Sequence, residues 1–167
     1  MPENNHGKIA PCLWFDHEAE EAAKYYTSIF KNSKMGEIAR YGEAGKEIHG
    51  QKPGSVMVVD FELDGQPFTI INGGPEFTFD EAVSFGITGK DQDEVDYYWE
   101  KLTEGGEESQ CGWLKDRYGL SWQVTPAGFE EIMTDADPER VNRALQAMFG
   151  MKKLDLAALR AAADGAG

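Results

Sequence analysis

The sequence predicts an α+β fold made of two βαβββ modules followed by C-terminal helices. Two observations carry this prediction: a strand, a helix and a β-hairpin occur twice in the same order, and residues beyond 126 show helical periodicity only. The 167 residues are 41% apolar and can bury a core without a metal or disulfide staple. We therefore expect a flexible N-terminus at 1–7, modules at about 8–76 and 80–126, and a helical extension at 127–167.

The first module shows helical and strand patterns in the order β-α-β-β-β. The helical stretch places its apolar residues at the i, i+3, i+4, i+7 spacing of one face, and Asp16 is its predicted N-cap. The pair Asp64-Gly65 between two alternating stretches predicts a hairpin turn. The predicted segments are a strand at 8–15, a helix at 18–30 and strands at 35–42, 55–64 and 66–73, with a mobile loop at 42–54.

The second module repeats this order in a shorter form. The tyrosine pairs at 25–26 and 97–98 are 72 positions apart, whereas the hairpin glycines Gly65 and Gly119 are 54 apart. The difference of 18 indicates that this module has lost most of the strand and loop between helix and hairpin. Asp91 and Glu94 resemble a capping box at the start of its helix. The other predicted segments are strands at 81–89, 111–116 and 120–125.

The residues after 126 predict helices. Asp137, Pro138 and Glu139 supply an N-cap, a proline in the first turn and an acidic residue near the helix start. The following apolar stripe contains Val141, Leu145, Met148 and Phe149, and a last helix is expected at about 156–163. These helices carry enough apolar surface either to cap their own chain or to pack on a second subunit, and the sequence leaves both open.

Charge excludes several classes of function. Lys and Arg total 16 against 30 Asp and Glu, for a net charge of −14, so nucleic acid and anionic membrane surfaces are not expected partners. No apolar stretch approaches the length of a membrane span, and the N-terminus lacks a signal-peptide pattern. Cys12 and Cys111 form no CxxC pair, and two cysteines cannot complete a zinc set. A cytoplasmic protein is the prediction.

Six motifs resemble the vicinal oxygen chelate superfamily, which includes glyoxalase I, bleomycin-resistance proteins and extradiol dioxygenases. Within it, the chain is most similar to the PhnB-like group, also described as 3-demethylubiquinone-9 3-methyltransferase-like. The motifs are Leu13–Asp16, Tyr25-Tyr26, Gly65–Phe68, Asn72–Phe77, Asp96–Trp99 and Cys111–Gln123. The resemblance covers about residues 8–126 and implies that the two modules form a glyoxalase-like half-barrel sheet in a homodimer. Methyl transfer is not expected, because no G-x-G-x-x-G turn follows a strand.

Catalytic members of this superfamily hold a divalent metal through four side chains, usually His and Glu, on the first and last strands of each module. The resemblance places these positions at Pro11, Thr69, Ser84 and Gln123, which are poor ligands for a catalytic metal. His6, His17 and His49 fall in the terminus, at the helix start and in a loop. We therefore expect no metal and no cofactor.

The remaining groups predict a binding site for a small, uncharged or weakly polar molecule. Trp122 is a further aromatic residue that could line it, and no residue is assigned a catalytic role. Two alternatives stay open: a divergent lyase, isomerase or dioxygenase using Cys12, Cys111, Asp60 or Gln123, and a partner-binding role for the C-terminal helices. The predicted ligand-binding residues are Cys12, Trp14, Thr69, Ser84, Trp113 and Gln123.

Overall fold

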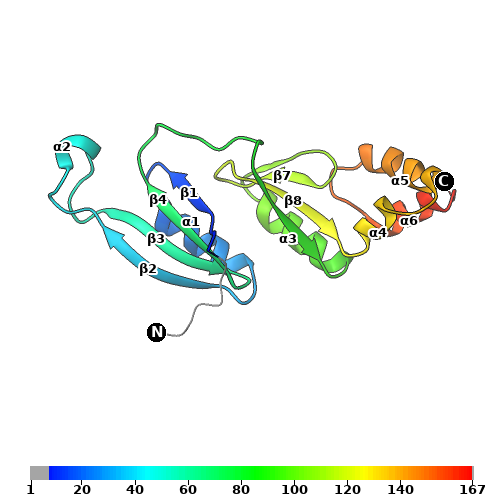
Figure 1. Cartoon of the computed structure of the whole chain (residues 1–167), viewed down its shortest axis with the longest axis horizontal. Coiled ribbons are helices and arrows are strands. Elements are labelled where there is room, and N and C mark those ends of the chain that lie inside the picture. Colours follow the sequence, from blue (N-terminus) through cyan, green and yellow to red (C-terminus); the bar gives the residue numbers. More distant parts are fainter. Residues whose placement is uncertain (1–7, 167) are drawn as a thin grey trace. The chain divides into compact units, whose positions relative to one another are not determined.

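The computed structural model describes residues 8–166 and divides the chain into two compact units, one ending at Thr78 and the other beginning at Phe79. Each unit contains one four-stranded mixed sheet with a helix packed on one face (Figure 1). This confirms the predicted α+β class with two βαβββ-type modules and C-terminal helices.

The first unit has the strand order β1-β4-β3-β2, with β1 parallel to β4 and the other pairs antiparallel. A short helix, α2, lies within the segment predicted as a loop. The elements are β1 (Cys12–Phe15), α1 (Ala19–Ile29), β2 (Lys34–Arg40), α2 (Lys46–His49), β3 (Val56–Leu63) and β4 (Gln66–Asn72).

Alternation along the strands builds the core of the first unit. On β3, Val59 and Phe61 are buried while Asp60 between them is exposed, as the period of two requires. Helix α1 buries Ala22 and Tyr26 against this sheet, and its small alanines allow a close approach. The face opposite α1 is called the open face here, and the same term is used for the second unit opposite α3.

Helix α1 is not capped by Asp16, which corrects the prediction. Glu18 holds the N-cap position, and its side chain makes no cap hydrogen bond. Instead Oδ1 of Asn72, at the end of β4, accepts a hydrogen bond of 2.8 Å from the backbone N–H of Ala19. The cap therefore comes from a strand 53 positions away, which local sequence patterns do not reveal.

The second unit has the strand order β5-β8-β7-β6, with β5 parallel to β8. β5 begins at Ser84 instead of residue 81. β6 has only two residues, which confirms the loss of most of this strand. Asp91 caps α3 as predicted, because its Oδ1 accepts from the backbone N–H of Glu94 at 2.9 Å. The elements are β5 (Ser84–Gly89), α3 (Gln92–Thr103), β6 (Glu107–Glu108), β7 (Trp113–Lys115) and β8 (Ser121–Pro126).

The structure changes the equivalence between the modules by one or two positions. Tyr26 of α1 and Trp99 of α3 occupy matching buried positions 73 residues apart. Tyr98, matched to the buried Tyr26 by sequence, is only half-buried. On β1 and β5, the first strands of the two modules, the buried residues Leu13 and Ile87 occupy matching positions 74 residues apart. The tyrosine pairs were therefore misleading by one residue on the helices and two on the strands.

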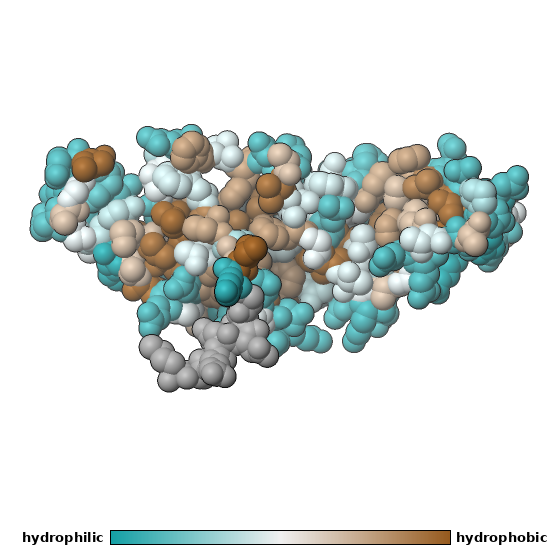
Figure 2. All heavy atoms as spheres, in the orientation of Figure 1, coloured by the Kyte–Doolittle hydropathy of each residue, from teal (hydrophilic) through white to brown (hydrophobic). Residues whose placement is uncertain are grey.

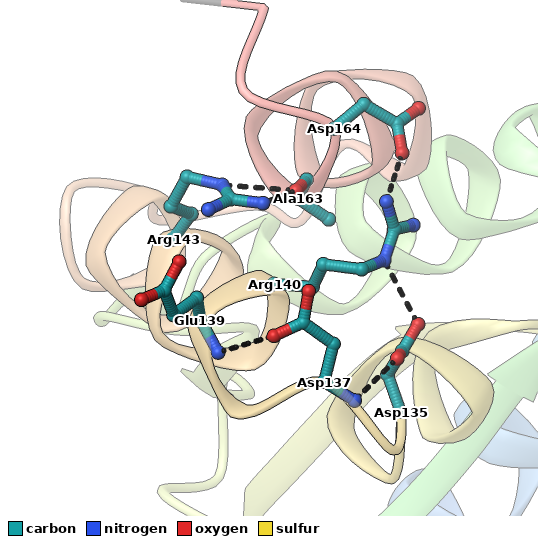
Figure 3. A network of polar contacts seen from close by, with 7 residues as sticks. All are labelled: Asp135, Asp137, Glu139, Arg140, Arg143, Ala163 and Asp164. Carbon is teal, nitrogen blue, oxygen red and sulfur yellow. Dashed lines mark hydrogen bonds and ion pairs between the residues drawn. The ribbon is translucent and has the colours of Figure 1, made fainter.

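Three C-terminal helices form a small core of their own within the second unit. They are α4 (Phe129–Met133), α5 (Pro138–Phe149) and α6 (Leu156–Ala163), and their core includes Ala144 and Leu159. Arg140 joins their ends, since it donates to Asp135 at 3.0 Å and to Asp164 at 2.6 Å (Figure 3). The Arg143 guanidinium also donates twice to the carbonyl of Ala163.

These helices are attached to their own chain, as one of the two alternatives left by the sequence predicts. The Gln92 side chain of α3 donates to the Leu154 carbonyl at 2.9 Å and accepts from the Leu156 N–H at 3.0 Å. The backbone N–H groups of Cys111 and Gly112 bond to the carbonyls of Met151 and Lys152. A side chain at Gly112 would crowd Leu154 and the Val124 carbonyl.

Part of the predicted apolar stripe on α5 remains outside this core. Ala144 is the buried residue of α5, Val141 and Leu145 are half-buried, and Phe149 is 64% exposed. Apolar colour is visible over the region of α5 and α6 in Figure 2. Among residues 8–166, no helix has both the length and the apolar character needed to cross a membrane.

Candidate functional site

The open face of the first unit contains a row of three side chains across β1, β4 and β3. The strand register places Cys12 beside Thr69 and Thr69 beside Asp60. The Thr69 hydroxyl donates to Oδ1 of Asp60 over 2.7 Å. Two predicted ligand-binding residues are therefore neighbours, and Asp60 joins them as the charged member of the row.

Cys12 is poorly suited to nucleophilic chemistry. Partial burial, together with the negative charge of Asp60, raises the pKa of its thiol. A nucleophilic cysteine needs the opposite effect, because the thiolate is the reactive form. Cys12 can therefore act at this face as a thiol but not as an activated nucleophile.

Trp14 is held by the loop that follows β4. Its indole N–H donates to the Gly74 carbonyl at 2.9 Å, and its ring meets Phe77 edge-on with centroids 4.9 Å apart. A Cβ atom on Gly73 would overlap the Trp14 ring. The Gly-Gly of the Asn72–Phe77 motif thus makes room for a half-buried tryptophan on the same face of β1 as Cys12.

The open face of the second unit brings the other three predicted residues together. Gln123 on β8 donates through Nε2 to the Ser84 hydroxyl at 3.0 Å. Trp113 on β7 is the register partner of Gln123 on its other side. The Cα partner of Gln123 on β5 is Gly86, where a side chain would meet no atom within 4 Å. This face therefore presents an amide, a hydroxyl and an indole beside a space that Gly86 leaves open.

Trp122 does not line this face. It lies on the opposite side of β8 among the buried residues, and its indole N–H donates to Oδ2 of Asp116 at 2.9 Å. Trp122 is a core residue of the second unit.

The residues present do not fit a divalent metal. In the strand register, Cys12 and not Pro11 lies beside Thr69, and Gly86 and not Ser84 lies beside Gln123. The four positions that correspond to the metal ligands of the superfamily therefore supply only a thiol, a hydroxyl and an amide. Such uncharged donors are weak ligands for a hard or borderline cation. Across residues 8–166 no three His, Cys, Asp or Glu side chains are grouped so that they could hold a metal ion.

The two described histidines of the first unit are not on its strands, since His17 precedes α1 and His49 ends α2. His17 is exposed and lies beside Asp16, and His49 in α2 contacts the Tyr41 ring at a centroid distance of 4.6 Å. His6 lies outside the described residues. Cys111, the other candidate thiol, is half-buried with its Sγ 3.6 Å from the Met148 carbonyl oxygen.

Two buried polar residues inside the motifs had no predicted role. Asn72 is 5% exposed; its Nδ2 donates to the carbonyls of His17 and Val56, and its Oδ1 caps α1. Asp116 is 2% exposed; Oδ1 accepts from the N–H groups of Tyr118 and Leu120, and Oδ2 accepts from Trp122. The available signal was a polar residue at an inward position of an alternating strand, as Asn72 is after Phe68 and Ile70.

The polar residues of the two sheets therefore divide into two groups. Asn72 and Asp116 hold the backbone, while Cys12, Thr69, Gln123 and their neighbours face away from the helices.

Comparisons with known proteins agree with this fold. The family model described as 3-demethylubiquinone-9 3-methyltransferase matches residues 7–125. The chain is 37% identical to the PhnB protein of Bacillus cereus, with a TM-score of 0.64, covering 72% of this chain and 100% of that one. It is 17% identical to protein PA1353 of Pseudomonas aeruginosa, with a TM-score of 0.57, covering 72% and 97%.

A more distant likeness extends to fosfomycin resistance. FosX of Listeria monocytogenes, in a structure complexed with MN(II) and sulfate ion, is 15% identical with a TM-score of 0.50, covering 78% of this chain and 98% of that one. At this identity the likeness shows the fold alone. The comparison with curated proteins found no match. The matched part of the family model stops at residue 125, so the helices α4–α6 lie beyond it.

Proposed function

Since the chain belongs to the family described as 3-demethylubiquinone-9 3-methyltransferase, in the vicinal oxygen chelate superfamily, we propose that it binds a small, uncharged or weakly polar molecule on the open faces of its sheets without a catalytic metal. The observation that carries the proposal is the donor set. By the resemblance, Cys12, Thr69 and Gln123 correspond to positions where metal-dependent members of the superfamily usually carry His or Glu ligands.

The chemistry of these faces supports an uncharged ligand. Thr69, Ser84 and Gln123 offer hydrogen-bonding groups, while Trp14 and Trp113 offer flat apolar surfaces. A pocket that is largely apolar with a few placed polar groups is typical of small-molecule binding. The net charge of −14 disfavours an anionic ligand.

Methyl transfer has no support from these residues. Methyltransferases that use S-adenosylmethionine hold it at a glycine-rich turn between a strand and a helix of a doubly wound sheet. Here β1 is followed by Asp16, His17 and Glu18 before α1, and the sheet orders are β1-β4-β3-β2 and β5-β8-β7-β6. The family description is therefore not carried over as an activity.

We further propose a cytoplasmic homodimer. The resemblance to the superfamily implies dimerisation, and the half-buried or exposed residues Val141, Leu145 and Phe149 on α5 supply an apolar contact surface. Sedimentation velocity should give a dimer for the wild type and a larger monomer fraction for Phe149→Ser. A monomeric wild type would contradict this part of the proposal.

The binding proposal is tested by metal content and by ligand screening on the same preparation. Elemental analysis should find well below one divalent ion per chain, and added Mn²⁺, Ni²⁺ or Zn²⁺ should not raise the melting temperature. A thermal-shift screen of small neutral compounds should give stabilisation that follows ligand concentration. Gln123→Ala should weaken a hit that binds to the second unit, whereas Thr88→Ala on β5 serves as the matched control.

Two outcomes would overturn the proposal. One firmly bound divalent ion per chain would restore metal chemistry, and turnover of a substrate abolished by Gln123→Ala or Thr69→Ala would make the protein an enzyme.

A further inference from the structure

A small pocket opens beside β6, β7 and β8 in the second unit. Its volume is about 130 Å³, enough for a group of a few heavy atoms. Lys115, Trp113 and Ser121 contribute to its wall, together with Glu81 and Glu107. None of the predicted ligand-binding residues except Trp113 belongs to it, so it extends the open face beyond Ser84 and Gln123.

Ser121 is the unusual member of this pocket. It is 1% exposed, and within residues 8–166 its hydroxyl is a buried polar side-chain group without a hydrogen-bond partner. Burying a hydroxyl without a partner is unfavourable, and native proteins satisfy nearly all such groups. The strand register places Ser121 between Lys115 and Ser84 on the open face. A polar ligand in the pocket would supply the missing partner.

Lys115, the register partner of Ser121 on β7, lines the same pocket with a charged donor. Its ammonium forms an ion pair with Glu81 at 2.5 Å. The hydrogen bond to Glu81 raises the pKa of Lys115, and the charges of Glu107 and Asp80 act in the same direction. A lysine ammonium has three N–H donors, so Lys115 can keep this ion pair and also donate to a ligand.

The charges around the pocket select against ions. Glu81, Glu107 and Glu108 line it against the single Lys115, so an anion would be repelled. A cation would compete with the ammonium of Lys115 for Glu81. Glu108 is already bonded to the Trp99 indole and paired with Lys152. A neutral group that both accepts and donates hydrogen bonds is not repelled by the carboxylates and does not compete with Lys115 for Glu81.

We propose that this pocket binds the carboxamide group of a small uncharged molecule, with its oxygen accepting from Ser121 and Lys115 and its N–H facing the carboxylate of Glu107. The rest of the molecule lies along Trp113. This inference rests on the proposed function and narrows the class of ligand to amides.

The test uses the full-length protein with ¹⁵N-labelled tryptophan side chains. Acetamide, acetate and methylammonium are probes of similar size that differ in charge. Acetamide should shift the Trp113 indole signal in a saturable way. The indole of Trp14, in the first unit, should stay in place. Acetate and methylammonium should bind at least fivefold more weakly.

Substitutions test whether the Ser121 hydroxyl binds the amide. Ser121→Ala should weaken acetamide binding at least fivefold and, because it removes an unsatisfied buried group, should raise the melting temperature of the free protein. The matched control is Thr88→Ala, which removes an exposed hydroxyl on β5 outside the pocket and should change acetamide binding less than twofold. Lys115→Met retains the aliphatic stem and should also weaken binding at least fivefold, so the test does not depend on one variant.

Each contrary result overturns the inference. Stronger binding of acetate or methylammonium would show the wrong class of ligand. No saturable shift of Trp113 with acetamide, or unchanged binding in both Ser121→Ala and Lys115→Met, would show that the pocket is not an amide site. A bound divalent ion near Cys12 or Gln123 would overturn the proposed function but would leave the acetamide result intact, so the two failures can be told apart.

Discussion

In the first unit the helix is capped by Asn72 from the end of β4, whereas in the second unit Asp91 caps the helix that follows it directly. The buried polar centre also differs. The first unit places a neutral amide between three backbone groups, and the second places the carboxylate of Asp116 among three N–H donors. The comparison teaches that the same chain order can be held by different polar groups, provided that each is fully bonded.

The edges of the two sheets differ as well. β2 has seven residues and pairs along β3, while β6 has two residues and pairs with β7. The second unit instead adds α4–α6, whose connecting segment bonds to Cys111, Gly112 and Gln92. In the second unit, the shortening of the edge strand β6 therefore coincides with additional packing from the helices α4–α6, which lie outside the βαβββ module.

The largest expected effect concerns the polar centre of the second unit. Asp116→Ala leaves the N–H groups of Tyr118 and Leu120 and the Trp122 indole without their acceptor, and should lower the free energy of unfolding by about 4 kcal/mol. Urea denaturation measures the loss. Asp93→Ala, an exposed acidic residue in the same unit, should stay within about 0.5 kcal/mol. A loss below about 1 kcal/mol for Asp116→Ala would contradict its central role.

The corresponding change in the first unit should be smaller, because the lost acceptor and donors are neutral. Asn72→Ala leaves the Ala19 N–H and the carbonyls of His17 and Val56 unpaired, and should cost about 2–3 kcal/mol. Hydrogen exchange should rise mainly in α1, whereas Asp116→Ala should affect the second unit most. Gln66→Ala, exposed on the same strand, is the control. Equal exchange changes in both units would remove the distinction between them.

Capping provides a sharper comparison with a smaller effect. Asp91→Ala removes a side-chain cap and should cost about 1 kcal/mol. Asp16→Ala should stay within about 0.5 kcal/mol, since Asp16 does not cap α1. Thermal unfolding of both variants measures the difference. A larger loss for Asp16→Ala would restore the cap predicted from sequence.

The smallest effect is a pH response confined to the second unit. The Trp99 indole N–H bonds to Glu108 and holds the pKa of that carboxyl below its ordinary value of 4.5, with Lys152 contributing. A lowered folded-state pKa means that this contribution to stability is present above pH 4.5 and is lost as the pH falls through the folded value. The Trp99 indole signal should shift over that range. The Trp14 indole, bonded to a backbone carbonyl, should not, and Glu108→Gln should remove the response.

Much of the fold was predictable because it depends on local periodicity. The alternation of Val59, Asp60 and Phe61, the Asp64-Gly65 turn and the Asp91 cap each follow from neighbouring residues. The cap of α1 was not predictable in this way, because Asn72 is 53 positions from Ala19. The module equivalence was wrong by one or two positions because Tyr98 matches Tyr26 in sequence, whereas Trp99 takes the buried position that Tyr26 has in the first unit.

The candidate site was likewise predictable from the sequence in part. Neighbouring strands of one module bring Cys12 to Thr69, and Ser84 to Gln123, and all four had been predicted as ligand-binding residues from the sequence. The replacement of Pro11 by Cys12, and the space left by Gly86, needed the strand register. Ser121 gave no signal in the sequence, because an unpartnered hydroxyl is a property of its surroundings.

The amino-acid sequence by itself determined the order of the elements and the family, and it predicted a binding site without metal ligands. These depend on residue type and on spacing along the chain. Tertiary structure decided which helix Asn72 caps, that α4–α6 pack on their own unit, and which hydroxyl lacks a partner. Those outcomes depend on contacts between residues far apart in sequence, and such contacts form only when the strands pair and the helices dock.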